Sequence, residues 1–332
     1  MRTKRPGNEG EAAFEVVFME RTATESWNQK SHPVSGQGSK APEQAHRGMA
    51  FWLLPAALGF VWTAAFCSGP SVRPRTSFTV QKDVLYGPDQ NLSADLYLPS
   101  RDTEDTKAAT PRPALLVLHG GSWQRGNKER MSEVSRLLAS QGYIVFNANY
   151  RLAPEHPYPA QMEDLKQALQ FMTRNAQSWN LDPGRIGVMG YSAGGHLALL
   201  LALQEDSVSA VATSGAPTDL TAYGDIVTMH RLLKVTFEDH PEVYRNASPL
   251  FRIRPDAPPI LLVHGSYDWI VPVEHARRME KAMKEAGGDI ELLEFPDGHM
   301  ATTLGVHEPG LRSMLSFFEK TLKPGIDMSA AK

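Results

Sequence analysis

The chain has 332 residues, of which 42% are hydrophobic and 21% are charged, a balance typical of a soluble globular protein with a sizeable core. The formal net charge is −3 at pH 7, so the composition lacks the basic excess that marks nucleic-acid-binding proteins. The single cysteine, Cys67, excludes an intramolecular disulfide.

The first part of the chain differs in composition from the rest. Residues 1–48 are polar and predict a disordered tail, or a stretch upstream of a true start at Met49. Residues 49–67 are uncharged and mostly apolar, which favours a signal peptide or a membrane anchor over a buried helix. Residues 68–77 are interpreted as a linker. A targeting segment would make the protein periplasmic, extracellular or membrane-anchored; without one it would be cytoplasmic.

From residue 78 onwards, short apolar runs alternate with helical patterns. Residues 78–86 and 92–98 predict an antiparallel hairpin. Further strands are predicted at residues 114–119, 143–149, 185–189, 210–214, 260–264 and 290–295. Helices are predicted at residues 129–141, 160–175, 196–203, 274–286 and 310–321. This alternation is typical of an α/β fold with a mostly parallel central sheet and helices on both faces, here over residues 78–323, before a flexible tail at 324–332.

Residues 217–258 interrupt the alternation between two predicted strands. They mix apolar residues with charged ones and contain several prolines. We interpret them as a small lid over the strand ends, where such sheets bind ligands; an ordinary long surface connection is the alternative.

A G-x-S-x-G motif at residues 190–194 stands where the strand at 185–189 passes into a helix. This is the context in which the motif presents a serine nucleophile, because the tight turn exposes the hydroxyl at the end of a sheet. Gly190 and Gly194 would keep side chains out of the close contact between strand and helix. Ser192 is therefore the predicted nucleophile.

A serine hydroxyl needs a base and an acid to orient that base, and in this kind of sheet they follow in the order acid, then histidine. Asp268 and His299 each lie just past a predicted strand and are the predicted acid and base. The competing histidines are His264, interpreted as structural, and His307, a weaker candidate for the base. Asp297 is interpreted as a turn aspartate.

The remaining requirement is a set of N–H groups for the developing oxyanion. The loop after the strand at 114–119 reads His-Gly-Gly-Ser-Trp and would supply the amides of Gly121 and Ser122, while Ala193 follows the nucleophile. The predicted substrate-binding residues are Gly120, Trp123 and Tyr191.

We predict no metal site and no cofactor. His230, His240 and His275 have no partner at a metal-ligand spacing.

Three segments, at residues 119–123, 150–160 and 190–195, together resemble the α/β-hydrolase esterases, above all those related to hormone-sensitive lipase and to bacterial feruloyl and acetyl-xylan esterases. The resemblance implies an α/β-hydrolase fold and cofactor-free hydrolysis of carboxylic esters by Ser192, His299 and Asp268. Within residues 150–160, a structural role is expected, with Arg151 pairing with Glu155 or Asp164.

The resulting hypothesis is a serine carboxylesterase that hydrolyses short-chain or small aromatic esters through an acyl-enzyme. Its partner is a small-molecule ester, with no nucleic acid and with membrane attachment only through residues 49–67. An arylformamidase-like or other amidase-type hydrolase is one alternative. A non-catalytic binding member of the fold is another.

Overall fold

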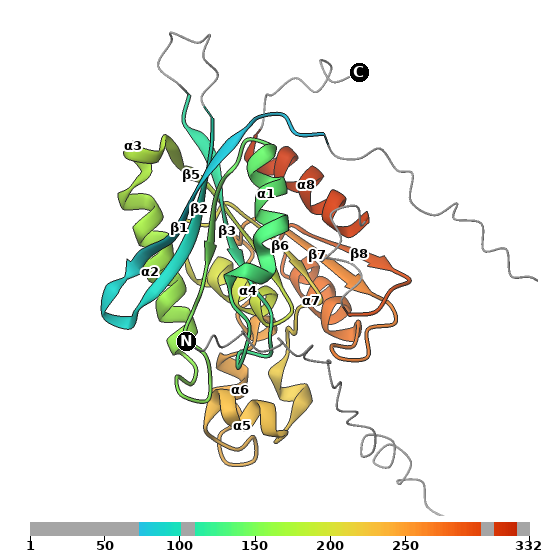
Figure 1. Cartoon of the computed structure of the whole chain (residues 1–332). Helices are drawn as coiled ribbons and strands as arrows, with labels where there is room; N and C mark the ends of the chain where they lie inside the picture. Colours follow the sequence, from blue (N-terminus) through green and yellow to red (C-terminus); the bar gives the residue numbers. More distant parts are fainter. Residues whose placement is uncertain (1–72, 101–109, 300–308, 324–332) are drawn as a thin grey trace, which may run out of the picture. The chain divides into compact units, whose positions relative to one another are not determined.

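A central sheet dominates the computed structural model, which describes residues 73–100, 110–299 and 309–323 (Figure 1). The eight strands lie in the order β1-β2-β4-β3-β5-β6-β7-β8. Their bounds are β1 (Phe78–Gly87), β2 (Leu92–Pro99), β3 (Arg112–Leu118), β4 (Ile144–Ala148), β5 (Leu181–Tyr191), β6 (Ala210–Ser214), β7 (Ile260–Gly265) and β8 (Ile290–Phe295). β1 pairs with β2, and β2 with β4, in antiparallel fashion, and the other neighbouring strands are parallel.

Helices cover both faces of this sheet. The α-helices that flank it are α1 (Ser132–Ser140), α2 (Ala160–Arg174), α3 (Ala176–Trp179), α4 (Ala193–Gln204), α7 (Glu274–Glu285) and α8 (Pro309–Leu322), and short 3-10 turns form η1 (Pro88–Gln90) and η2 (Lys128–Met131). One hydrophobic core contains residues of α2, α4 and α7, and the other contains residues of α1 and α8. The mostly parallel sheet with helices on both faces confirms the predicted fold class.

The two cores follow from the alternation of side chains along each strand. In β3, Leu116 and Leu118 belong to the core under α2 and α4, whereas Leu115 and Val117 belong to the core under α1 and α8. All four side chains are fully buried. A parallel strand covered on both faces must be apolar throughout, which is why the sequence pattern of this strand is continuous rather than alternating.

Four short elements lie between β6 and β7 in the segment predicted as a lid. They are η3 (Leu220–Tyr223), α5 (Val227–Leu233), α6 (Pro241–Asn246) and η4 (Pro249–Phe251), with α5 and α6 at the bottom of Figure 1. Leu220, Met229 and Tyr244 are buried in the same core as α2 and α4. The segment therefore packs on the sheet domain through its apolar residues, while its role as a lid stays a prediction.

Most predicted elements agree with the structure. The hairpin is present, and residues 210–214 and 290–295 match β6 and β8 to the residue. The predicted helix at 129–141 begins instead as the 3-10 turn η2, and β5 starts at Leu181 rather than at Arg185. Neither α3 nor the four elements between β6 and β7 are predicted from the sequence pattern.

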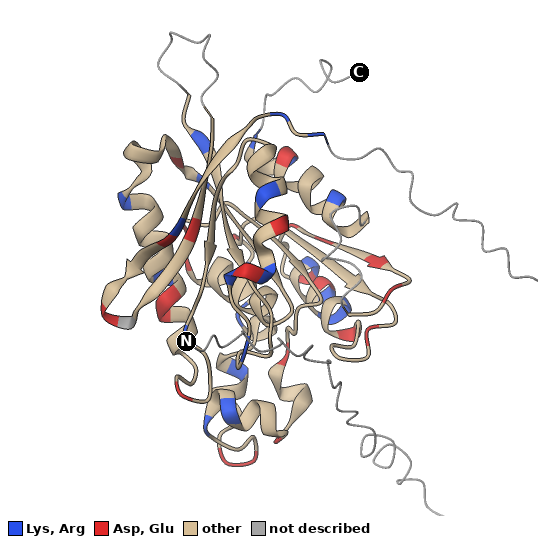
Figure 2. Ribbon diagram, in the orientation of Figure 1, with Lys and Arg blue, Asp and Glu red and all other residues tan. Residues whose placement is uncertain are grey.

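Positively and negatively charged residues are interspersed along the helices and loops (Figure 2). Among the described residues, no helix is both long enough and apolar enough to cross a membrane. The segment predicted as a signal peptide or anchor, residues 49–67, lies outside the described residues.

Candidate active site

Ser192 occupies the sharp turn between β5 and α4. Its backbone has φ 52° and ψ −121°, a conformation that is costly for a residue with a side chain. A Cβ at Gly190 would lie 2.2 Å from the Gly194 carbonyl oxygen. A Cβ at Gly194 would lie 2.4 Å from the carbonyl oxygens of Leu118, the last residue of β3, and His119. The two glycines of the motif are thus required by close backbone contact, and this turn places the serine at the carboxyl end of the sheet.

The three predicted catalytic residues form one hydrogen-bonded chain. The Ser192 hydroxyl lies 3.0 Å from Nε2 of His299, and Nδ1 of His299 lies 2.6 Å from Oδ2 of Asp268. Ser192, Asp268 and His299 follow β5, β7 and β8, whose carboxyl ends lie along the same edge of the sheet. The structure therefore brings together residues that are separated by up to 107 positions in sequence.

The Asp268 carboxylate is surrounded by donors. Oδ1 accepts the backbone N–H groups of Ile270 and Val271, at 3.0 and 2.9 Å. Nε2 of His264 lies 2.8 Å from the Val271 carbonyl oxygen and 3.4 Å from Oδ2 of Asp268. Burial by itself raises the pKa of Asp268, but the contacts with His264, His299 and Val271 outweigh it and hold the pKa well below its usual range. The carboxylate is therefore ionised at neutral pH.

The loop after β3 approaches the nucleophile. Gly120 lies so close that a Cβ there would fall 2.9 Å from Tyr191 and 3.0 Å from Ser192. Gly121, Ser122 and Trp123 then have φ values of 134°, 53° and 60° in succession. Ala193 is the first residue of α4, so its N–H has no acceptor one turn earlier in the helix. Ser122 and Ala193, two of the residues predicted to bind the oxyanion, line the same cavity as Ser192.

A cavity of about 110 Å³ opens at this serine. It is lined by Ser122, Trp123, Ser192, Ala193, Pro217, Tyr223, Ile226, Thr228, Met229, Ile270 and Val271. The walls thus come from the loop after β3, the elbow, the predicted lid and the loop after β7. Of the predicted substrate-binding residues, Trp123 lines the cavity, whereas Gly120 packs against the elbow and the ring of Tyr191 lies 5.3 Å from that of His299.

The competing residues have other contacts. His264 is buried, as expected of a structural histidine, but its contact with Asp268 was not anticipated. His275 accepts the N–H groups of Thr218 and Asp219 at its Nδ1. Asp297 accepts the Tyr267 N–H through its carbonyl oxygen, in a turn. His307 lies outside the described residues.

The segment at residues 150–160 braces the loop after β3. The Tyr150 hydroxyl donates to the carbonyl oxygen of His119, and the two rings stack 4.3 Å apart. Arg151 pairs with Asp164, at 2.7 Å, which confirms one of its two predicted partners; its other carboxylate partner is Glu163 rather than Glu155. The segment therefore has the structural role expected for it.

Sequence reasoning missed two features of the site. His196 sits in the first turns of α4, where its Nδ1 accepts the Trp123 indole N–H at 3.1 Å and its Nε2–H donates to the Ala247 carbonyl. Lys128, two residues beyond Gly126, is buried. His196 follows the segment at 190–195, and Lys128 lies a few residues after the segment at 119–123. A polar residue near a motif is too common to indicate a role in the site.

Comparison with known proteins places the chain in a family. The BD-FAE family model matches residues 94–283. Esterase LipC of Mycobacterium tuberculosis is 34% identical over 244 residues, which are 66% of this chain and 59% of LipC. Isoprenylcysteine alpha-carbonyl methylesterase ICME of Arabidopsis thaliana is 26% identical over 255 residues, 69% of this chain and 58% of ICME. The chain thus spans less than two thirds of the length of these relatives.

Solved structures agree on the fold. A truncated carbohydrate esterase from gut microbiota superimposes with a TM-score of 0.65 at 23% identity, covering 76% of this chain and 98% of that one. The match therefore covers nearly the whole length of the carbohydrate esterase. With the family match over residues 94–283, we conclude that the chain belongs to the BD-FAE family and has the fold of the α/β-hydrolase esterases.

Proposed function

We propose that the protein is a serine carboxylesterase. The observation that carries the proposal is the hydrogen-bonded chain from Ser192 through His299 to Asp268 at the mouth of the cavity. The relatives named as esterases support the same reaction class. The direct test is covalent labelling of the full chain by a fluorophosphonate probe, with the labelled peptide identified by mass spectrometry. Labelling at Ser192 is expected, and a chain that resists labelling would be a non-catalytic binding protein.

Acylation begins with a proton transfer. As Ser192 Oγ attacks the ester carbonyl, its proton passes to Nε2 of His299, 3.0 Å away. Asp268 accepts the Nδ1–H of the same ring, which fixes the tautomer and stabilises the imidazolium that forms. The carbonyl oxygen gains charge and receives hydrogen bonds from the amides of Ala193, Gly121 and Ser122.

Release of the product completes the cycle. The imidazolium of His299 gives its proton to the departing alcohol, leaving the acyl group on Ser192. A water molecule then enters, His299 removes its proton, and the same amides stabilise the second tetrahedral intermediate. The free acid leaves, and Ser192 regains its proton.

The cavity predicts the size of the acyl group. Its volume of about 110 Å³ is well below the range of roughly 300–1,000 Å³ found for drug-sized ligands. Tyr223, Met229 and Val271 contribute largely apolar walls, which suit a short aliphatic acid. We expect the highest kcat/KM on acetyl to butyryl esters, because each methylene left outside forfeits about 0.8 kcal/mol of burial. The measurement is kcat/KM across a p-nitrophenyl ester series, with a steep fall beyond about eight carbons.

A variant with a larger cavity tests whether the cavity wall sets the preferred acyl length. Met229→Ala shortens one wall and is expected to move the optimum to longer chains without changing turnover of the acetyl ester. A wild-type maximum at twelve carbons or more, or activation by an emulsified triglyceride surface, would rule out the short-acyl specificity. Either result would leave the esterase mechanism itself intact.

His264 is expected to assist the acid. His264→Phe removes the Nε2–H, which donates to the Val271 carbonyl oxygen and lies 3.4 Å from Oδ2 of Asp268. The kcat should then fall about tenfold through weaker orientation of the base, since leaving a buried hydrogen-bonding group unpaired costs roughly 1–3 kcal/mol. His264→Gln retains an N–H donor on a side chain of similar reach and should recover part of the loss. The check is kcat on p-nitrophenyl acetate for both variants. Equal activity of the phenylalanine variant and the wild type would show that the contact has no catalytic effect.

A further inference from the structure

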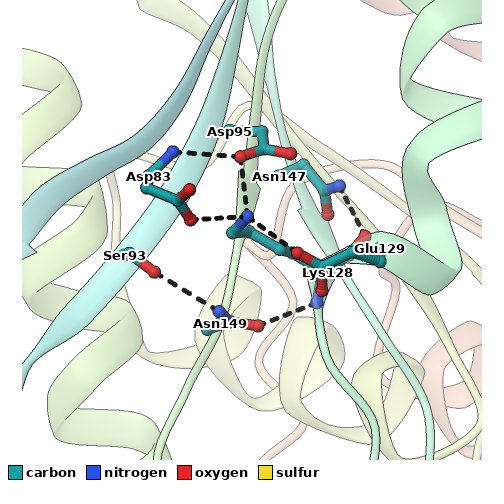
Figure 3. A network of polar contacts seen from close by, with 7 residues as sticks. All are labelled: Asp83, Ser93, Asp95, Lys128, Glu129, Asn147 and Asn149. Carbon is teal, nitrogen blue, oxygen red and sulfur yellow. Dashed lines mark hydrogen bonds and ion pairs between the residues drawn. The ribbon is translucent and has the colours of Figure 1, made fainter. Parts of the chain in front are cut away.

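An ionic network centred on a buried lysine lies beside the loop that carries the predicted oxyanion amides (Figure 3). At its centre is Lys128, whose side chain is 2% exposed. Its ammonium lies 2.7 Å from Asp95 of β2, 3.0 Å from Asp83 of β1 and 2.9 Å from the adjacent Glu129. Asp95 is fully buried. Burying a lysine is costly unless it is paired, so the network commits this side chain to one position.

The backbone of Lys128 is held as firmly as its side chain. Its N–H donates to Oδ1 of Asn149 at 2.7 Å, and its carbonyl oxygen accepts Nδ2 of Asn147, also at 2.7 Å (Figure 3). Asn147 belongs to β4, and Asn149 follows the end of the same strand. Lys128 is therefore fixed at three points, through its ammonium and both of its peptide groups, to β1, β2 and β4.

This fixed residue ends the loop that begins at β3. Between Leu118 and Lys128 the chain passes through four residues with positive φ, two of which, Ser122 and Trp123, are not glycine. Such conformations persist only where the surroundings enforce them. Gly126 packs against the start of the same loop, where a Cβ would lie 2.4 Å from the Gly120 carbonyl oxygen. The loop is thus closed on itself, and its conformation depends on how both of its ends are held.

We propose that Lys128 is a positioning residue, which holds the end of the loop at 119–127 so that the amides of Gly121 and Ser122 meet the developing oxyanion. The inference rests on the proposed esterase function. Preorganised amides lower the barrier because they need no rearrangement at the moment of reaction. A loop released at Lys128 can relax from its positive-φ conformations, and such relaxation would carry these amides away from Ser192.

The test compares three substitutions in the full chain. Lys128→Met removes the ammonium, and the double variant Lys128→Met with Asp95→Asn also removes the buried negative charge that would be left unpaired. Arg185→Met is the matched control, since it breaks the contacts of Arg185 with Asp182 and the Pro111 carbonyl. Arg185 lies seven residues before Ser192 along β5, roughly 20 Å from the site at the rise of an extended strand.

The readout separates positioning from stability. Fluorophosphonate titration counts the competent sites, and kcat per titrated site is measured on p-nitrophenyl acetate well below the melting temperature of each variant. We expect both Lys128 variants to lose about tenfold or more in kcat with little change in KM, because the lost interaction exists only in the transition state. Arg185→Met should lose thermal stability and retain its kcat per site.

Two outcomes would overturn the proposal. Unchanged kcat per site in the Lys128 variants, with a lower melting temperature alone, would make the network merely structural. A loss of kcat/KM that comes entirely from a higher KM, with kcat per site unchanged, would place the effect in substrate binding. If both Lys128 variants fail to fold, Asn149→Ala removes only one tie to the Lys128 backbone and must show a smaller loss of kcat in the same assay. A wild-type chain with no esterase activity and no labelling would refute the proposed function itself, which the same experiment reveals separately.

Discussion

Replacement of Ser192 with alanine is expected to lower kcat on p-nitrophenyl acetate by about 10⁴-fold or more, because nucleophile, base and acid act as a unit. The melting temperature should stay close to that of the wild type. Alanine retains the Cβ, so the backbone at φ 52° is no more and no less strained than before. The measurements are steady-state kinetics and a thermal melt on the same preparation.

A glycine at the same position provides an informative companion. Ser192→Gly should be as inactive as the alanine variant but more stable, by roughly 1 kcal/mol or more, since glycine adopts positive φ without the steric cost of a side chain. Turnover by Ser192→Ala comparable to the wild type would refute the assignment of the nucleophile. A destabilised glycine variant would contradict the view that the backbone conformation of Ser192 is costly for a residue with a side chain.

The inner strands of the sheet, such as β4, β6 and β7, were predictable because they are buried on both faces and are therefore nearly continuous apolar runs. β6 and β8 are short runs dominated by apolar residues and bounded by a polar residue on one side and a glycine or proline on the other, and their ends matched the prediction. β5 was predicted too short, since its first residues, Leu181 to Gly184, include an aspartate, a proline and a glycine, which ordinarily argue against a strand. Pairing of Leu181 with Arg112, across a shift in register, places these residues in the sheet.

The segment between β6 and β7 shows the limit of periodicity. α5 has seven residues and α6 has six, too few for a repeat of 3.6 residues to become visible. Their apolar residues Met229 and Tyr244 belong to the same core as residues of α2 and α4, and Tyr244 also packs against Phe237 of the insertion. Tertiary packing therefore defines these helices, and the sequence alone could indicate only that an insertion was present.

The candidate site was predictable where a motif fixes local geometry. Ser192 and the loop at 119–123 were found because G-x-S-x-G and His-Gly-Gly require particular backbone conformations that few sequences satisfy. Lys128 was missed, because a lysine followed by Glu129 resembles the exposed start of a helix. Its burial depends on Asp95, which is 33 residues away in sequence and belongs to another strand. Only the assembled fold shows that pairing.

Asp268→Asn is expected to reduce kcat by about 10⁴-fold, because the substitution reverses a hydrogen bond on which the base depends. Oδ2 of Asp268 accepts Nδ1–H of His299, which leaves Nε2 free to receive the serine proton. An asparagine amide that donates to Nδ1 would favour the opposite tautomer, with the proton already on Nε2.

The matched control for this substitution is Asp297→Asn, two residues before His299. Asp297 contributes its backbone to the turn, where its carbonyl oxygen accepts the Tyr267 N–H and its own N–H donates to Phe295, and neither contact involves the side chain. We therefore expect Asp297→Asn to retain kcat within a few-fold of the wild type. Both variants are measured on p-nitrophenyl acetate at neutral pH, where the depressed pKa of Asp268 keeps the wild-type carboxylate ionised. A larger loss of kcat in Asp297→Asn than in Asp268→Asn would show that Asp268 is not the acid, because only the residue that orients His299 can produce the tautomer effect.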